Sequence, residues 1–291
     1  MVAKAQIDSS YIKTYPQRIR IMGYISSSFI QITDDNENNY IPNNRLTAGL
    51  GFAIKNTIFS FQPGYGFFPL KDNKEYGKSK TMDFQIHNYG RKMILDLFLQ
   101  NYKGFYTENN SGEVRNIFPD MSVLHIGAEA TYLFNNKKFS SKAAFDLNEI
   151  QLQSAGSWLL GGGAYFYNLK GIENGTSNST SEFENLQLGI NGGYAYSWRV
   201  DEHWLLSGMV KGGANFGNTP KAVSKGKMEV YPTAFGRLAG NYQKNNWGLS
   251  MIVIIGNKSV YPIQIDKLTL TTISMQLSFV KHLDNLYKRK K

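Results

Sequence analysis

Apolar and polar residues alternate along most of the chain. The clearest run extends from Leu186 to Val200: its even positions are almost all large and apolar, and its odd positions are small or polar, with Gln187, Asn191, Ser197 and Arg199 among them. Period-two alternation indicates a β-strand that faces two different environments. As a strand this run would rise roughly 50 Å, far more than the five or six residues of an ordinary strand. Such length is typical of a tilted barrel strand that spans a bilayer.

The same pattern predicts further strands along the whole chain. The candidates are residues 18–32, 44–55, 57–67, 81–89, 92–106, 121–134, 137–147, 155–169, 184–199, 203–216, 227–242, 246–256 and 267–281. Their number is odd, whereas a single-chain bacterial barrel normally has an even count. We therefore expect an all-β fold, an up-and-down antiparallel transmembrane β-barrel of about 12 strands, with about 14 as the alternative.

The links between these strands alternate in length. Short links at 55–57, 89–91, 135–137, 200–202 and 243–246 alternate with long polar links at 33–43, 68–80, 105–119, 170–182, 217–226 and 257–266. Outer-membrane barrels are built with short turns at one rim and long loops at the other. The alternation fails between residues 135 and 182, so we expect residues 137–153 to be partly an excursion from the barrel.

Composition favours one domain. The 28 Gly, 18 Tyr and 18 Phe are spread evenly, and charged residues at 19% are too few for a disordered or coiled-coil chain. The longest apolar run is residues 251–255, which excludes transmembrane helices. We expect a lead-in at 6–17, a single β-barrel domain at 18–282 and a basic tail at 283–291.

Cysteine usage and charge exclude several classes of function. The chain has no cysteine, which removes disulfides, thiolate catalysis and cysteine-ligated metals. Ala3-Lys4-Ala5 matches the small-x-small pattern of a signal-peptidase site, so residues 1–5 are interpreted as a signal-peptide remnant; an ordinary short N-terminus is the alternative. The net charge is +10, but the lysines are scattered and only residues 288–291 form a basic block, so nucleic acid is not an expected partner.

Charged residues occupy the polar face of the predicted strands and would point into the barrel. The candidate lumenal cluster is Asp83, His87, Asp96, His125, Glu129, Arg199, Lys211, Glu229 and Arg237, with Lys142 and Asp146 on the doubtful strand. Both signs are present. Paired charges of this kind indicate either a closed interior held by ion pairs or a selective pore with a small-molecule site.

A catalytic or metal site is a weaker interpretation. Asp83, His87, Asp96, His125 and Glu129 fall on neighbouring predicted strands, and histidines with carboxylates can bind a divalent metal or perform acid–base chemistry. Period two places many such pairs on one face by chance. No Gly-x-Ser-x-Gly elbow occurs, and residues 161–163, three glycines, lack the Gly-Lys-Ser/Thr of a phosphate loop. No catalytic residue, metal or cofactor is predicted.

The four tryptophans fall near predicted strand ends. They are Trp158, Trp198, Trp204 and Trp247. Tryptophan and tyrosine collect at membrane interfaces, so these residues are predicted to form an aromatic girdle; ordinary aromatic packing in a soluble β protein is the alternative.

The stretch from Asp83 to Tyr106, with its His-Asn-Tyr-Gly-Arg-Lys and Asp-Leu-Phe-Leu-Gln-Asn-Tyr-Lys-Gly-Phe-Tyr segments, resembles a family of exported Bacteroidota proteins of unknown function. The opening Asp8-Ser-Ser-Tyr-Ile12, residues 139–155 and the glycine-rich strand that follows are similar to it as well. The resemblance implies an outer-membrane β-barrel and supplies no catalytic residues. One departure is the chain end: Phe279 is followed by residues 280–291, whereas such barrels usually end on an aromatic residue.

These observations favour an outer-membrane β-barrel of a Gram-negative bacterium, acting as a structural or accessory subunit of an envelope complex or as a narrow transport pore, without enzymatic chemistry. The expected partners are outer-membrane lipid and other envelope proteins. Two alternatives stay open: an outer-membrane enzyme that acts on lipid or envelope glycan through the lumenal His/carboxylate cluster, and a soluble periplasmic β-barrel that binds a lipidic ligand.

Overall fold

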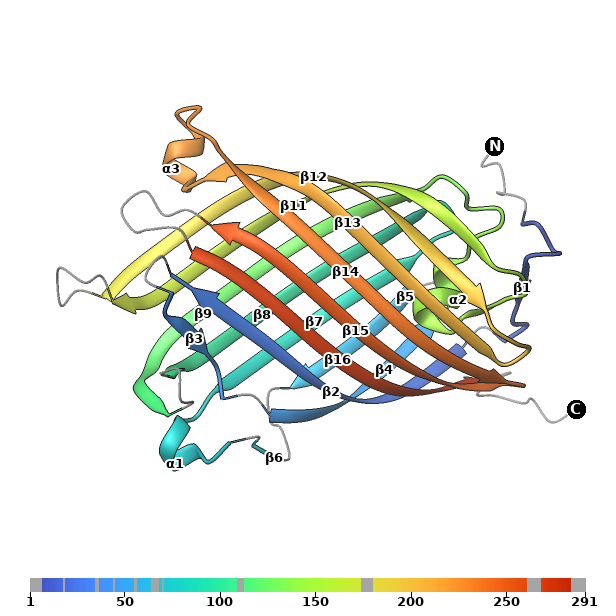
Figure 1. The fold of residues 1–291 in the computed structure, drawn as a ribbon, viewed down its shortest axis with the longest axis horizontal. Helices are drawn as coiled ribbons and strands as arrows, with labels where there is room; N and C mark the ends of the chain where they lie inside the picture. The colour runs from blue at the N-terminus through green and yellow to red at the C-terminus, as the bar shows by residue number, and fades with distance from the viewer. Residues whose placement is uncertain are drawn as a thin grey trace, which may run out of the picture.

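The computed structural model describes residues 7–17, 19–34, 37–43, 45–54, 57–63, 68–69, 71–108, 113–173, 180–260 and 268–283. Its main sheet wraps into a closed antiparallel barrel (Figure 1). The wall strands are β2 (Ile19–Thr33), β4 (Arg45–Ile54), β5 (Thr57–Pro63), β7 (Lys80–Tyr89), β8 (Met93–Glu108), β9 (Val114–Leu133), β11 (Ala155–Glu173), β12 (Thr180–Arg199), β13 (Trp204–Asn218), β14 (Glu229–Lys244), β15 (Trp247–Val260) and β16 (Leu268–Leu283).

The wall closes in two ways. Near the rim with short turns, β2 pairs with both β16 and β4, and the strands named above form a ring of about 12, as the sequence predicts. At the opposite rim the short strand β3 (Asn39–Ile41) pairs with β2 and with β8, which makes a smaller ring of ten strands through β3. In that ring β4, β5 and β7 are attached strands, and β6 (Phe68–Pro69) pairs with β4.

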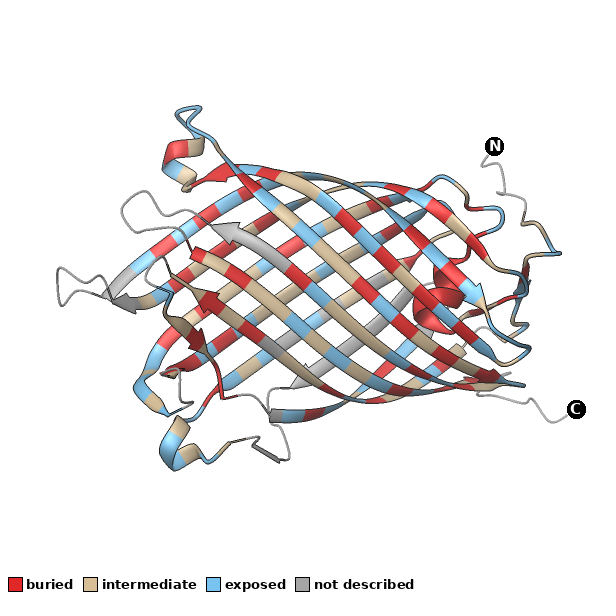
Figure 2. Ribbon diagram, viewed as in Figure 1, coloured by how far each residue is buried: buried red, intermediate tan, exposed pale blue. Residues whose placement is uncertain are grey.

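Alternation along the strands separates the two faces of the wall (Figure 2). On β12, Leu188 and Ile190 are 58% and 57% exposed, whereas Asn185 and Gln187 on the opposite face are 0% exposed. The same division holds on β13, where Val210 is 64% exposed. The barrel therefore presents apolar side chains outward and encloses polar ones, which is the inverse of a water-soluble protein and the arrangement of membrane barrels.

A six-residue helix, α2 (Ser141–Asp146), lies within the described link between β9 and β11. The strand expected at 137–147 is therefore wrong, while the expected excursion at 137–153 is confirmed. The Ser140 side chain accepts a hydrogen bond from the Ala143 amide and caps the helix, and all six helical residues are buried. A segment buried on every side shows no amphipathic period, and its run of apolar and polar residues imitates a short strand. We call residues 135–153 the plug.

Helix α2 of the plug lies inside the short-turn end of the barrel (Figure 1), and polar side chains of the wall hold it there. Asp146 forms a buried ion pair with Arg20 of β2. The Asn241 amide of β14 donates to the carbonyls of Ala143 and Ala144 at 3.0 and 2.8 Å, which satisfies backbone groups near the helix end. The His282 ring of β16 lies 2.9 Å from the Leu147 carbonyl. The plug is thus tied to three wall strands.

A second charge cluster in the plug surrounds Glu149. Its carboxylate pairs with Arg91 and lies 3.5 Å from Lys142. Burial lowers the pKa of Lys142, against the raising effect of Glu149. Ser140 donates to the same carboxylate at 2.5 Å. A carboxylate that is 3% exposed is therefore held by cations and a hydroxyl, which offsets the cost of removing it from water.

The lead-in joins the plug. Strand β1 (Ile12–Thr14) pairs with β10 (Glu149–Gln151) in a separate two-stranded sheet. The Tyr15 ring then stacks on His282 with the ring centroids 3.8 Å apart. Residues 1–6 and 284–291, which contain the predicted signal-peptide remnant and most of the basic tail, lie outside the described residues.

The long-loop end carries α1 (Asn73–Tyr76) and α3 (Pro220–Val223) (Figure 1). Within the described ranges, none of the helices has the length and apolar character of a membrane span.

Two apolar clusters fill much of the interior. The first gathers Tyr40, Phe105, Tyr167 and Leu268 with neighbouring residues of the long-loop half of the wall. The second packs Phe139, Ala144 and Phe145 of the plug against wall residues that include Tyr89, Ile94, Leu159 and Met209. The barrel is consequently packed near both ends.

Candidate functional site

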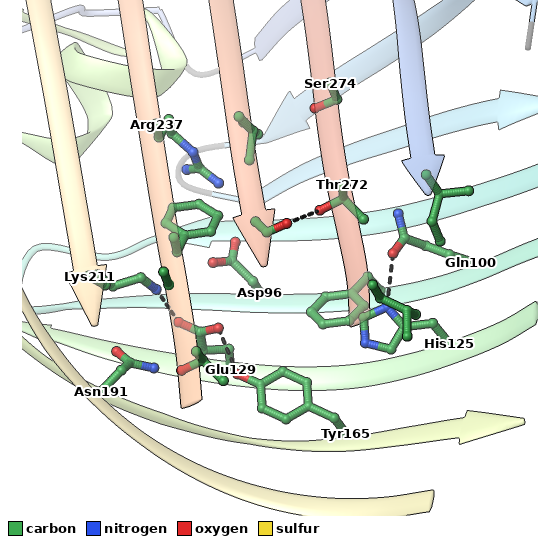
Figure 3. Close-up of a pocket in the computed structure, with 18 of the residues that line it drawn as sticks. Asp96, Gln100, His125, Glu129, Tyr165, Asn191, Lys211, Arg237, Thr272 and Ser274 are labelled. Carbon is green, nitrogen blue, oxygen red and sulfur yellow. Dashed lines mark hydrogen bonds and ion pairs between the residues drawn. The ribbon is translucent and has the colours of Figure 1, made fainter. Parts of the chain in front are cut away.

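A cavity of about 190 Å³ lies inside the barrel, between the two apolar clusters. Its walls include Ile30, Tyr102 and Tyr167 of the first cluster and Ile94 and Met209 of the second. Asp96, His125, Glu129, Lys211 and Arg237 also line it (Figure 3). We call this cavity the lumenal chamber. It combines an aromatic lining with a few convergent charges, which is the usual character of a small-molecule site.

Glu129 is the centre of a compact network on one side of the chamber (Figure 3). Its carboxylate forms an ion pair with Lys211 of β13. The Tyr165 hydroxyl donates to it at 2.8 Å, and the Thr131 hydroxyl lies 3.4 Å from it. The side chains of Lys211 and Glu129 are 6% and 14% exposed, so the pair is mostly removed from water. Mutual neutralisation is what makes such burial tolerable.

Arg237 of β14 is held differently. Its guanidinium makes one hydrogen bond, from Nη1 to the Tyr89 hydroxyl at 3.1 Å. It lies over the rings of Phe145 and Phe235 at 5.3 and 5.4 Å, which are cation–π distances. The residue is 6% exposed, yet among the described residues no carboxylate forms an ion pair with it and its Nε has no partner. Guanidinium has five N–H donors, so most of them are not used by the described part of the protein.

Aromatic rings form the long-loop side of the chamber. His125 stacks on Tyr167 with centroids 4.4 Å apart, and Phe98 lies 4.7 Å from His125. The Gln100 side-chain oxygen lies 3.1 Å from His125 Nδ1, which fixes the imidazole plane. The rings give the chamber flat apolar walls.

Glycines create the space for these side chains. A Cβ at Gly161 would lie 2.5 Å from Asn191 Oδ1, and one at Gly163 would lie 2.7 Å from the Tyr165 hydroxyl. Gly161 and Gly163 therefore make room for these side chains on β11, and the shape of the chamber depends on them.

The structure brings five of the predicted lumenal residues together and separates two. Asp96, His125, Glu129, Lys211 and Arg237 line the chamber. Arg199, in contrast, donates to the Glu202 carbonyl at the short-turn rim, and Glu229 accepts from Tyr231 at 3.4 Å at the start of β14. The side chains of Asp83 and His87 lie outside the described residues; their backbones pair with Gln100 and Asp96. In the described part of the chain, no group of three His, Cys, Asp or Glu could hold a metal ion.

All four tryptophans lie near the short-turn ends of their strands. Trp158, Trp198 and Trp204 are 68%, 54% and 45% exposed, and Trp247 is partly exposed. Tyr242 contacts Trp204 and Trp247 at centroid distances of 5.3 and 5.6 Å. This placement is compatible with the predicted girdle, whose membrane contact stays a prediction.

Sequence reasoning did not single out several residues that shape the site. Tyr165 and Asn191 line the chamber, and Arg20 anchors the plug. Their inward position follows from the alternation, but their partners do not, because those partners come from strands distant in sequence. The Arg20–Asp146 pair joins residues 126 positions apart.

Comparison with known proteins gives a family and no activity. The family described as "Domain of unknown function (DUF4421)" matches residues 6–279. No curated protein matches the sequence. Solved structures that are similar include the β domain of the Bordetella autotransporter BrkA (9% identity, 90% of this chain and 99% of that chain, TM-score 0.41). Another is the outer membrane protease OmpT from Escherichia coli (8% identity, 93% of this chain and 98% of that chain, TM-score 0.39). A third is the P. putida toluene transporter TodX (8% identity, 93% of this chain and 91% of that chain, TM-score 0.34).

Proposed function

We propose that this chain, which belongs to the DUF4421 family, is an outer-membrane β-barrel that works as a narrow transport pore for small solutes. The observation that carries the proposal is the lumenal chamber, a largely apolar cavity with a few charged side chains that lies between two apolar clusters inside a closed barrel. A central binding cavity with a barrier on each side is the arrangement expected of a pore in its closed state.

The outer face of the barrel supports the membrane location. Apolar side chains such as Leu50 (78% exposed), Val210 (64%) and Leu238 (63%) cover the wall. Exposed apolar area of this extent marks a surface that contacts another apolar phase. Short turns at one rim and longer connections at the other favour an orientation with the plug toward the periplasm.

The proposed pore is closed by two barriers, one at each end of the lumenal chamber, and the test removes each of them. The plug closes one end, and Tyr102 and Tyr167, 4% and 1% exposed, belong to the cluster that closes the other. Replacing residues 137–153 by a short Gly/Ser turn keeps the β9–β11 hairpin, in which Leu133 pairs with Leu159. Tyr102→Ala with Tyr167→Ala opens the opposite cluster.

The measurement is ion conductance in planar bilayers, after cell fractionation and a heat-dependent gel shift have established location and folding. Only the variant with both barriers removed is expected to conduct steadily, because either barrier alone keeps the path closed. Phe216→Ala, on the outer face and 42% exposed, is the matched control and should behave as the parent protein. A folded doubly opened barrel without conductance would overturn the pore and favour the structural or accessory role.

A further inference from the structure

We infer that the lumenal chamber binds a small aromatic monocarboxylate, with the carboxylate on Arg237. This inference rests on the proposed function and names the class of solute. The spare donors of Arg237 carry it: a guanidinium that is 6% exposed makes one hydrogen bond, and its Nε has no partner among the described residues. Asp96 and Glu129 lie near enough to attract this guanidinium but form no ion pair with it in the described part of the chain, so they leave its donors unused. A buried donor without a partner is costly, and a planar carboxylate matches the fork of guanidinium donors.

The charges of the chamber favour a monoanion over a dianion at Arg237. Lys211 is already neutralised by Glu129, so it offers little to a ligand. Arg237 is the other cation that the structure describes in the lining. Asp96 lines the same cavity and would repel a dianion such as a phosphate monoester more strongly than a monoanion. One carboxylate therefore fits the electrostatics better than a phosphate.

The size and the lining select an aromatic body. A cavity of about 150 Å³ can hold a benzene molecule, and the lumenal chamber has about 190 Å³. Phe98, Tyr165, Tyr167 and Phe235 present rings to it, and offset or edge-to-face contacts between rings stabilise a bound aromatic group. Benzoate combines this body with the required charge.

Further polar atoms in the chamber offer partners for a substituent. Asn191 and Tyr167 line the cavity, and Asn191 Oδ1 and the Tyr167 hydroxyl are buried and have no hydrogen-bond partner among the described residues. Buried polar atoms of native proteins normally have partners. A ligand hydroxyl or an ordered water would satisfy them.

The test uses ¹⁹F NMR titration of the folded full-length barrel in detergent. 4-Fluorobenzoate is compared with 4-fluorobenzamide, a neutral molecule of nearly the same shape that partitions into detergent as an apolar control. We expect saturable binding of the acid at least about tenfold tighter than that of the amide, as a charge-assisted hydrogen bond requires. Arg237→Gln should abolish this preference, whereas Arg237→Lys should retain part of it.

Arg199→Gln is the matched control, because Arg199 is another arginine on a wall strand and its guanidinium donates to the Glu202 carbonyl outside the chamber. It should preserve the preference for the acid. Equal affinity for acid and amide, a preference that survives Arg237→Gln, or no saturable binding to the folded protein would each overturn the inference. If a variant fails to fold, the comparison of acid and amide binding on the parent protein still tests the inference. The conductance of the doubly opened barrel is measured without the acid, so the test of the proposed function is independent of the test of the ligand.

Discussion

Asp146→Asn tests how firmly the plug is held in the barrel. Asp146 and Arg20 form an ion pair whose side chains are 1% and 3% exposed. The substitution removes the negative charge and leaves the guanidinium of Arg20 in the same buried place. Breaking one partner of a buried pair costs about 3–5 kcal/mol, because the remaining charge is neither solvated nor neutralised. The cost falls on the docked plug, since undocking lets water reach Arg20.

The expected shift in plug docking is large. About 1.4 kcal/mol corresponds to a factor of ten, so the undocked fraction should rise by roughly two to three and a half powers of ten. The assay is limited trypsin digestion of the folded barrel, with cleavage after Lys142 measured by mass spectrometry. Lys142 is buried in α2, and its cleavage requires undocking, whereas exposed Lys137 reports protease activity in the same sample. When the plug closes faster than it is cut, the rate follows the open population.

Two further variants make the result specific. Asp120→Asn removes an exposed ion pair with Lys103, 3.0 Å long, and should leave the cleavage rate unchanged, because exposed pairs contribute about 1 kcal/mol or less. Arg20→Met with Asp146→Leu removes both buried charges and should return the rate toward that of the parent. The reasoning is refuted by an unchanged rate in Asp146→Asn, or by a double variant that is cut as fast as the single one.

Lys211→Met deprives the buried Glu129 carboxylate of its cation and should destabilise the barrel by about 3 kcal/mol, measured as a lower temperature for loss of the folded gel band. Adding Glu129→Gln should restore most of the lost stability. An unchanged temperature in the single variant would contradict the role of the ion pair. Burial raises the pKa of Tyr15 to about 12, against the lowering effects of Gln243 and Arg199. Since this pKa exceeds the unfolded value of about 10, lead-in docking is fully favoured below pH 10 and weakens as the pH rises to 12. The difference in phenolate absorbance between the parent and Tyr15→Phe should titrate near pH 12; a midpoint near 10 would disprove docking.

The wall strands could be predicted from the sequence because their two faces meet different surroundings. Strand β12 was expected at 184–199 and is found at Thr180–Arg199, and β13 was expected at 203–216 and is found at Trp204–Asn218. Because lipid-facing and interior positions alternate along a wall strand, apolar and polar residues alternate in its sequence. Strand β9 begins earlier than expected, at Val114, because the segment before residue 121 lacks alternation and is instead paired with β8.

The plug and the chemistry of the chamber depend on long-range pairing that no local pattern encodes. Inward polar residues look the same in the sequence whether they sit in a satisfied network, as Glu129 does, or retain unused donors, as Arg237 does. The difference comes from register: Glu129 pairs with Gly163 and Asp96, whereas Arg237 pairs with the uncharged Met209 and Ile254. A one-residue shift would turn every inward group outward. The sequence therefore predicts which charged residues face the interior. Which of these charges is available to a ligand depends on the pairing of the wall strands in the folded barrel.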